Sequence, residues 1–360
     1  MTGPEIRTAV LGASGYIGQH FARELADHPE FLPPRLIASG RSEGKRLGDV
    51  WQLSEPPPSS LETTRIESLS VARLVRAGVQ VVFSALPSGF AGPVEREFTI
   101  RGVSVFTNAA DHRLDADVPL LIPEVNADHL ALAERRRPGH GLLVANPNCS
   151  TTGLVLSMAP IVGLLRPRAV HVATYQALSG AGVPGVPSLA IADNVVPFIA
   201  EEEEKISRES ARLLGIQKGG RVSPSPIPIL AHCARVGTRD GHLEAVTVEA
   251  TRGPSQGALE AAWRGFDPLQ RDRLPTAPHP PVQLRPEVDR PQPVRDRWAG
   301  APIRARGMAA VVGRVRWDPP FLRFFVLTHN AVRGGAGGSV LNAELALARR
   351  ALPGGASADR

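Results

Sequence analysis

The sequence predicts an α/β protein of two domains: an N-terminal domain built on a Rossmann-type parallel sheet, and a second domain of the α+β class. Up to Ala145, short apolar segments alternate with helical patterns, which is typical of a doubly wound parallel sheet. After Pro147 the strand-like segments are separated by long proline-rich connections. A length of 360 residues also favours two hydrophobic cores over one.

The first domain opens with a strand, a glycine turn and a helix. Ile6–Val10 is the apolar strand, and Tyr16–Leu25 carries apolar residues at helical spacing. Later buried strands of the same sheet are predicted at Arg35–Ala38, Val79–Ala85, Val103–Thr107 and Leu142–Ala145.

The second domain mixes helices and strands. A helix is predicted from Ser150, and strands are predicted at Ala169–Gln176, Ala245–Ala250 and Met308–Val315. The stretch Leu274–Pro293 is dense in proline, so we expect it to wrap the surface. At the end of the chain, the glycine loop Gly334–Gly338 is predicted to open a last helix, Ser339–Ala351, whose first amide groups suit an anion.

Composition places the chain among globular proteins, since 42% of its residues are hydrophobic and 21% are charged. No apolar run is long enough to span a bilayer and the N-terminus lacks the order of a signal peptide, so we expect a soluble cytoplasmic protein without a membrane partner. The formal charge of +6 comes from scattered arginines, which argues against nucleic acid and suits phosphorylated or carboxylated ligands. The two cysteines, Cys149 and Cys233, are expected to be reduced thiols, and no metal site is predicted.

The turn after the first strand has the pattern of a phosphate-binding loop. Its glycines allow the backbone to turn sharply and to approach a pyrophosphate at the N-terminus of the following helix. A purely structural turn is the alternative, because a glycine pattern alone is weak. The residues expected to contact the cofactor are Gly12, Ala13, Ser14, Gly15, Tyr16 and Ile17.

The end of the second predicted strand distinguishes the two nicotinamide cofactors. A carboxylate there accepts from the ribose 2′-hydroxyl of NAD, whereas a cation and hydroxyls suit the 2′-phosphate of NADP. Ala38 is followed by Ser39, Arg41 and Ser42, with no acid among them. The segment therefore favours NADP, and the alternative is that Arg41 is a solvated residue of a surface loop.

Cys149 follows a predicted strand and stands at the start of a predicted helix. The helix dipole and the free amide groups of a helix start favour the thiolate, which is the nucleophilic form. The alternative is a buried, inert thiol, and we expect ordinary packing for Cys233.

Further candidates lie later in the second domain. His242 can donate and accept a proton in turn, and Arg235 can fork onto a carboxylate, although either alone is more often a surface or structural residue. The run Glu201–Glu204 before Lys205 is equally consistent with a solvated helix start. A dinucleotide domain joined to a domain with a nucleophilic cysteine would fit a thioester-forming dehydrogenase.

At NPNCSTTGLV, residues 146–155, the chain resembles the aspartate-semialdehyde dehydrogenase family, most closely its archaeal and fungal branch. The resemblance covers nearly the whole chain. Its other blocks are Gly12–Gly18, NAADHR at 108–113, IPEVN at 122–126, 174–188, 193–205, DGHLEAV at 240–246, 289–296, 307–316 and 329–345.

The resemblance implies a role for each matching residue. Cys149 matches the acylated nucleophile, His242 the general acid/base and Gln176 the residue that orients the substrate. Arg235 and Glu202 match the groups that hold the substrate's α-carboxylate and α-amino ends, although the adjoining glutamates leave Glu202 uncertain by one position. Arg113 and Lys205 match the phosphate-binding cations, and the second domain contributes Ser179, Gly180 and Asn330 to the cofactor site.

The resemblance also implies an activity and an assembly. The activity is the NADP-dependent reduction of L-aspartyl 4-phosphate to L-aspartate 4-semialdehyde, with release of phosphate, which feeds lysine, threonine and methionine biosynthesis. The cofactor domain would span residues 1–148 and be completed by the C-terminal helix at about 334–352, with the catalytic and dimerisation domain at 149–333. A homodimer or homotetramer is expected.

Two departures from the family pattern bear on substrate choice: Ala234 to Gly237 reads Ala-Arg-Val-Gly where the family usually has Asn-Arg-Val-Pro, and Ser14 replaces the usual Thr. A reductase of another acyl phosphate, such as N-acetylglutamyl phosphate, is the alternative enzyme. A regulator that binds NADP without catalysis is the alternative of another class. Arg235 with Glu202 argues against the first, and the presence of Cys149, Gln176 and His242 argues against the second.

Overall fold

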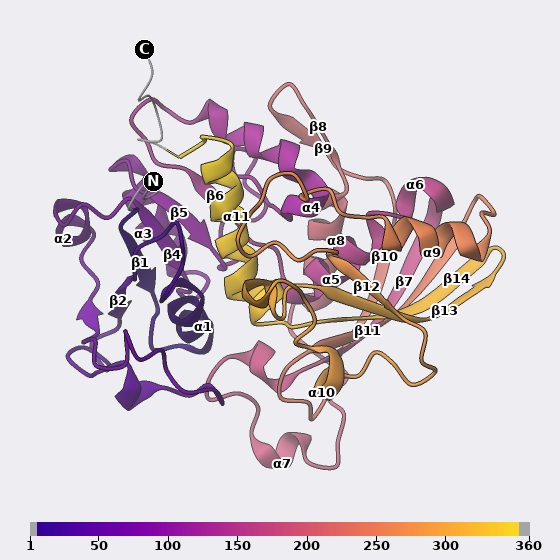
Figure 1. The fold of residues 1–360 in the computed structure, drawn as a ribbon, viewed down its shortest axis with the longest axis horizontal. Coiled ribbons are helices and arrows are strands. Elements are labelled where there is room, and N and C mark those ends of the chain that lie inside the picture. Colours follow the sequence, from indigo (N-terminus) through magenta and orange to yellow (C-terminus); the bar gives the residue numbers. More distant parts are fainter. Residues whose placement is uncertain (1–5, 353–360) are drawn as a thin grey trace. The chain divides into compact units, whose positions relative to one another are not determined.

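The computed structural model describes residues 6–352, and its internal contacts divide the chain into two compact units (Figure 1). Of the described residues, the first unit contains those up to Leu121, those from Asp128 to Asn146, and those from Ala336 to Leu352. The second contains Ile122–Ala127 and Pro147–Gly335. The segment Ile122–Ala127, which we expected in the first domain, therefore belongs to the second unit.

The first unit is built on a sheet in which all strands are parallel, as predicted. The strands are β1 Thr8–Leu11, β2 Arg35–Ala38, β3 Glu67–Ser68, β4 Val81–Ser84, β5 Ser104–Thr107 and β6 Leu143–Ala145. Their order in the sheet is β3-β2-β1-β4-β5-β6. Successive strands are therefore added on one side of β1 up to β3 and on its other side from β4 onward, so the order of strand addition reverses between β1 and β4. In open α/β sheets, the crevice at the carboxyl ends of the strands beside this reversal is the usual ligand site.

Helices cover the first sheet because its short strands are apolar on both faces. They are α1 Tyr16–Leu25, α2 Val71–Arg76, α3 Ala91–Ile100 and α11 Gly337–Ala348, with 3-10 segments at Gly48–Val50 and Ala127–Arg135. Rings of Phe21, Phe31 and Phe106 contact Phe83 of β4 in the core. The predicted glycine loop before the last helix is wrong in detail, because Val332–Ala336 forms a π-helical turn and α11 begins at Gly337.

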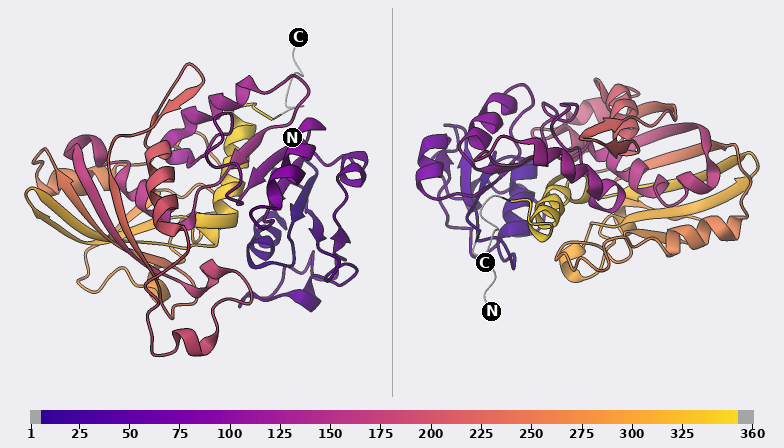
Figure 2. Two further views of the ribbon diagram at one scale, coloured as in Figure 1. Left: turned by 180° about the vertical axis from the view of Figure 1, so that it is seen from behind. Right: turned by 90° about the horizontal axis from the view of Figure 1, so that it is seen from above.

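The second unit is built on a mixed sheet of longer strands (Figure 2). In spatial order they are β10 Ile229–Arg235, β7 Pro167–Gln176, β11 His242–Ala250, β14 Phe321–Thr328, β13 Ala310–Asp318 and β12 Val282–Arg285. Burial alternates along β11 between buried and half-buried residues, so one face of this sheet is covered and the other is partly open. A separate hairpin is formed by β8 Ile216–Lys218 and β9 Arg221–Ser223.

Helix α5, Cys149–Met158, packs on the covered face of this sheet, against β11 and β14. The remaining helices of the unit are α4 Pro123–Asn126, α6 Val162–Leu165, α7 Ser188–Ile191, α8 Glu202–Leu213, α9 Gln256–Arg264 and α10 Pro293–Asp296, with 3-10 turns at Leu178–Ala181 and Ile303–Ala305. Trp263 of α9 packs edge-on against Phe324 and donates to the carbonyl of Ser157 in α5 at 2.8 Å. These contacts join α9 to α5 and to the sheet.

The expectation that Leu274–Pro293 merely wraps the surface is wrong. Leu274 and Ala277 are buried, and Val282–Arg285 forms strand β12, paired in parallel with the start of β13. The strand lies at the sheet edge, where flanking prolines are tolerated, so the prolines hid it from the sequence pattern. Within residues 6–352, no helix has the length and apolar character needed to cross a bilayer.

Candidate active site

Cys149 is the first residue of α5, one position earlier than the predicted helix start. The side chain of Asn148 caps the helix, because its Oδ1 accepts from the backbone N–H groups of Ser150 and Thr151 at 2.9 and 3.1 Å. These two amides are therefore not free to stabilise a thiolate, contrary to our expectation. The helix dipole and a side-chain partner remain to do so.

That side-chain partner is His242, at the start of β11. Its Nε2 lies 3.1 Å from Cys149 Sγ, and the ring is fully buried. Its Nδ1 lies 3.0 Å from the backbone N–H of Ala177, which can only donate. The ring proton of neutral His242 must therefore reside on Nε2 and point at the sulfur. Burial, together with Arg235 and His329, lowers the pKa of His242 to about 3, so the ring is neutral at physiological pH.

Arg235 ends strand β10, and its side chain is largely buried. Its Nη1 donates to the carbonyl of Ala177 at 2.8 Å. Burial lowers the pKa of Arg235, and the nearby Cys149 and Glu202 oppose that shift. Because burial penalises this charge, an anionic ligand would be favoured beside it. Gly180, expected to line the cofactor site, lies against Arg235 and His242, since a Cβ built there would be 2.7 Å from Arg235 Nη1 and 3.2 Å from His242 Nε2.

Glu202 stands apart from the other glutamates of its run, because it is buried while Glu201, Glu203 and Glu204 are exposed. Its Oε1 accepts from Asn148 Nδ2 and from Gln176 Nε2, both at 2.9 Å. Asn148 thereby links Glu202 to the start of α5, beside the nucleophile. The structure thus brings together Cys149, His242, Arg235, Gln176 and Glu202 in the second unit.

Lys205 and Arg113 are placed differently. Lys205, on α8, forms a largely exposed ion pair with Glu201 at 3.0 Å. Arg113 belongs to the first unit, where it is nearly buried and donates to the carbonyl of Asn108 at 2.7 Å. Both side chains could engage an anion only by exchanging these contacts or by using their remaining N–H groups.

Glu244 is a site-adjacent residue that the sequence interpretation missed. It lies two positions after His242 on the covered face of β11, and its side chain is 1% exposed. Neither carboxyl oxygen has a hydrogen-bond partner among the described residues. Burial, and then the nearby Glu202, raises the pKa of Glu244 well above its ordinary value, which favours the protonated form of this buried carboxyl group. The alternation of DGHLEAV was the available signal.

The glycine loop at the end of β1 has the shape of a phosphate cradle. Gly12 has a φ of +79°, and a Cβ on it would lie 2.6 Å from the carbonyl oxygen of Ala85. A Cβ on Gly18 would collide with the backbone of Gly12 at 2.0 Å. Gly15 is the N-cap of α1 and provides no side-chain hydrogen bond to the first turn, and the N-terminus of a helix favours an anion. The loop therefore fits a dinucleotide pyrophosphate.

The residues expected to select NADP lie in an exposed turn after β2. Ser42 N–H donates to the carbonyl of Ser39 at 2.9 Å, and Arg41 is exposed between them. The turn keeps a guanidinium and two hydroxyls at the carboxyl end of β2, which is suited to a phosphate.

The remaining predicted cofactor residues meet in the second unit. Asn330 Nδ2 donates to Ser179 Oγ at 2.8 Å, and Asn330 Oδ1 accepts from the backbone N–H of Gly241 at 2.8 Å. The structure thereby fixes the Ser179 turn beside the strand that carries His242.

Both cysteines are free, but their surroundings differ. Burial raises the pKa of Cys233 to about 12, which makes this thiol a poor nucleophile. Among the described residues, no group of three or more His, Cys, Asp or Glu side chains is arranged to hold a metal ion.

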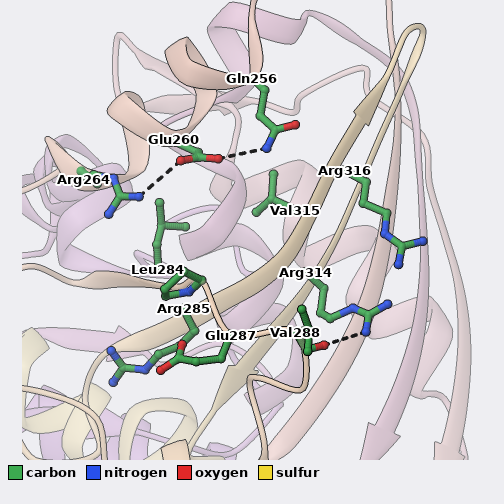
Figure 3. A pocket seen from close by; sticks show the side chains of 11 residues that line it. Gln256, Glu260, Arg264, Leu284, Arg285, Glu287, Val288, Arg314, Val315 and Arg316 are labelled. Carbon is green, nitrogen blue, oxygen red and sulfur yellow. Dashed lines mark hydrogen bonds and ion pairs between the residues drawn. The ribbon is translucent and has the colours of Figure 1, made fainter.

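A hollow of about 340 Å³ lies elsewhere in the second unit, between α9 and the strands β12 and β13 (Figure 3). Several of its polar side chains are already engaged: Glu260 pairs with Gln256 and Arg264 along α9, and Arg314 donates to the carbonyl of Val288. None of the predicted site residues lines this hollow.

Comparisons with known proteins agree along nearly the whole chain. Residues 7–133 match the family model described as semialdehyde dehydrogenase, NAD binding domain, and residues 158–333 match the one described as semialdehyde dehydrogenase, dimerisation domain. The chain is 45% identical to the aspartate-semialdehyde dehydrogenase of Archaeoglobus fulgidus, over 95% of this chain and 98% of that protein. It is also 37% identical to the malonyl CoA reductase (NADP) of Metallosphaera sedula, over 94% and 96%. The crystal structure of aspartate semialdehyde dehydrogenase with NADP from Candida albicans superposes with a TM-score of 0.83 at 31% identity, covering 96% and 99% of the two chains.

Proposed function

The chain belongs to the aspartate-semialdehyde dehydrogenase family, and we infer from this that it reduces L-aspartyl 4-phosphate to L-aspartate 4-semialdehyde with NADPH, through a thioester on Cys149. The observation that supports the chemistry most directly is the 3.1 Å approach of His242 Nε2 to Cys149 Sγ. A buried neutral imidazole with its proton on Nε2 donates to the sulfur and favours the thiolate.

The covalent step follows from this pair. The Cys149 thiolate attacks the acyl carbon, the bond from that carbon to the phosphate oxygen breaks, and phosphate leaves with the electron pair. Lys205 and Arg113 are the cations proposed to receive the phosphate. His242 Nε2–H then faces the thioester and can donate a hydrogen bond to the oxygen that becomes negative when the carbonyl is reduced.

NADPH, when bound, supplies the hydride that reduces the thioester. The loop Gly12–Ile17 would hold its pyrophosphate, and Ser39, Arg41 and Ser42 would hold the 2′-phosphate. Ser179, Gly180 and Asn330 would border the cofactor from the catalytic domain. This assigns the cofactor to residues 1–148 with the C-terminal helix, and catalysis to residues 149–333.

The charged groups support a substrate with a free amino acid end. Arg235 has further N–H groups for a carboxylate besides the one that Ala177 accepts, and Glu202 has a second oxygen for an ammonium group. Gln176, held by Glu202, would orient the acyl group. An N-acylated substrate has no ammonium group, and its acyl group would have to lie against the buried carboxylate of Glu202.

A malonyl-CoA reductase is the second candidate, because such an enzyme is among the relatives that match nearly the whole chain. Malonyl-CoA would also form a thioester on Cys149 and would present a carboxylate to Arg235. It has no amino group, however, and its own negative charge would be repelled by Glu202. Glu202 therefore favours aspartyl phosphate.

The test is a set of oxidations run in the reverse direction with NADP. We expect NADPH formation from aspartate semialdehyde that requires inorganic phosphate, with much weaker activity toward N-acetylglutamate semialdehyde. NADPH formation that requires coenzyme A and malonate semialdehyde instead would replace the assignment. Equal rates with NAD and NADP would contradict the roles given to Ser39, Arg41 and Ser42.

We further propose that the protein works as a dimer in the cytoplasm. The match of residues 158–333 to a dimerisation domain supports the assembly, as do Tyr175 and Leu230, which are 40% and 51% exposed on the open face of the second sheet. A tetramer would need a further contact surface.

A further inference from the structure

The turn between β7 and α7 contacts both His242 and Arg235, the side chains that would serve the sulfur and the substrate carboxylate. Ala177 follows strand β7, and Leu178–Ala181 forms a 3-10 turn. Ala177 N–H donates to His242 Nδ1 at 3.0 Å, and the Ala177 carbonyl accepts from Arg235 Nη1 at 2.8 Å. One alanine thus joins the ring that serves the sulfur to the guanidinium that would serve the substrate carboxylate.

Backbone hydrogen bonds hold the turn in place. Leu178 N–H donates to the carbonyl of Thr238 at 2.7 Å, Ser179 N–H to that of Arg239 at 3.1 Å, and Gly180 N–H to that of Ala177 at 3.1 Å. The segment 238–239 directly precedes β11, which begins with His242. The turn therefore cannot shift without moving the strand that carries the histidine.

Gly180 closes the arrangement by having no side chain. A Cβ there would lie 2.7 Å from Arg235 Nη1, and 3.1 and 3.2 Å from Cε1 and Nε2 of His242. Contacts under 3 Å require a shift, and those slightly above it require the neighbour to move by a few tenths of an ångström. Both neighbours are buried and hydrogen-bonded to Ala177, so neither moves without losing that bond.

We propose that residues Ala177–Gly180 are the positioning element of this site: the backbone of Ala177 fixes His242 in the tautomer with its proton on Nε2 and orients Arg235, and Gly180 leaves the space that both side chains need. The proposal rests on the proposed thioester chemistry of Cys149. It assigns to Gly180 a role toward the substrate and the histidine, beyond the cofactor contact that the family resemblance implies.

The consequence is that His242 acts from a single nitrogen. Proton uptake at Nδ1 would break the bond from Ala177 and would place two N–H groups against each other. Nε2 is therefore the ring nitrogen that faces Cys149 and is left to serve the sulfur and the substrate oxygen. Ala177 is hydrogen-bonded to Arg235 as well as to His242. A displaced turn would therefore impair both the binding of the substrate carboxylate and the hydrogen bond from His242 to the sulfur.

The first test is Gly180→Ala, with Gly257→Ala as the matched control. Gly257 lies on α9, and a Cβ there meets no heavy atom within 4 Å. For Gly180→Ala we expect KM for aspartate semialdehyde to rise and kcat to fall, each by roughly ten- to a hundred-fold, because hydrogen bonds to charged or reacting groups are displaced. The control should keep wild-type constants. Wild-type constants in Gly180→Ala, or a change confined to KM for NADP, would overturn the proposal.

The second test needs no variant of the turn and no substrate. Nitrogen-15 NMR of the histidine-labelled full-length protein, with the His242 signals identified by their loss in His242→Gln, reports the protonation of each ring nitrogen. We expect a neutral ring with Nδ1 bare and Nε2 protonated from pH 6 to pH 8. A proton on Nδ1 in that range would overturn the proposal even if Gly180→Ala failed to fold. If the protein did not oxidise aspartate semialdehyde at all, this measurement would still decide the role of the turn.

Discussion

Near Cys149, the absence of a side chain on a glycine leaves the space that the nucleophile occupies. Gly334 is the clearest case, because a Cβ built on it would lie 2.7 Å from both Cα and Cβ of Cys149. The obstruction is backbone and the first side-chain atom, which cannot swing away as the end of a long side chain can. The position of the nucleophile therefore depends on a glycine from the π-helical turn at the far end of the second unit's sequence.

We predict that Gly334→Ala displaces Cys149 and slows its alkylation by iodoacetamide, at a stability cost of about 1 to 3 kcal/mol. The matched control is Gly163→Ala, since a Cβ on Gly163 in α6 meets nothing within 4 Å. Alkylation measured at fixed pH without substrate separates this effect from substrate binding. An unchanged alkylation rate in Gly334→Ala would show that the turn accommodates the methyl group and that our account of its packing is wrong.

The titration of Glu244 predicts how the stability of the folded protein changes with pH. Burial raises its pKa in the folded protein well above the ordinary value, which favours the protonated form. Its contribution to stability is fully present below the unfolded pKa and is lost as pH rises toward the folded value, at about 1.4 kcal/mol per pH unit within that window. Glu244→Gln removes this titration.

The measurement is urea unfolding of the wild type and of Glu244→Gln from pH 5 to pH 8. We expect the wild type to lose more stability than the variant as pH rises. A constant difference between the two across the range would mean that Glu244 is ionised in the fold and has a partner after all.

At the scale of elements, the apolar pattern predicted strands and helices well where nothing functional interrupts it. Tyr16–Leu25 and Arg35–Ala38 were predicted with the bounds that the structure gives. Strand β11 was predicted to begin at Ala245, but it begins at His242. The buried polar residues His242 and Glu244 occupy its covered face and hide the start of the alternation. Functional residues thus blur the pattern that would reveal their own element.

Some residues of the candidate site could be predicted from the sequence, and others could be identified only from the fold. Cys149, His242, Arg235, Gln176 and Glu202 could be proposed from sequence blocks, because their side chains carry the chemistry. The contributions of Ala177, Gly180 and Gly334 to positioning could not, because they are backbone contacts between segments far apart in the chain. Which of the adjoining glutamates faces inward likewise depended on how α8 packs, and only the fold distinguished Glu202.

Asn148 both caps helix α5 and donates a hydrogen bond to Glu202 of the candidate site. A matched pair of variants can separate the effect of the cap from the effect of that hydrogen bond. Asn148→Ala should lose about 0.5 to 2 kcal/mol of stability through the cap of α5, and Ser255→Ala should lose a similar amount through the cap of α9. Of these two capping residues, only Asn148 also donates to Glu202. We therefore expect a raised KM for aspartate semialdehyde in Asn148→Ala alone, measured beside the unfolding of both. Equal KM values in the two variants would mean that the bond to Glu202 does not contribute to substrate binding.

At the scale of the whole molecule, the parallel sheet of the first unit and the mixed sheet of the second agree with the predicted fold class.

The open face of the second sheet gives a prediction for the proposed dimer. Leu230→Glu places a charge on that face and should convert the protein to a monomer in sedimentation or light scattering. Ile216→Glu, on the separate β8 to β9 hairpin where Ile216 is 73% exposed, is the control that should stay dimeric. A dimeric Leu230→Glu protein would move the interface elsewhere.

We expect Cys149, and not Cys233, to form the acyl intermediate. Mass spectrometry of the protein mixed with aspartyl phosphate in the absence of NADPH tests it directly. We predict an aspartyl adduct on the peptide that contains Cys149, discharged when NADPH is added and absent in Cys149→Ser, whose turnover should fall roughly a thousand-fold or more. An adduct on Cys233, or steady turnover with no adduct on Cys149, would contradict the account.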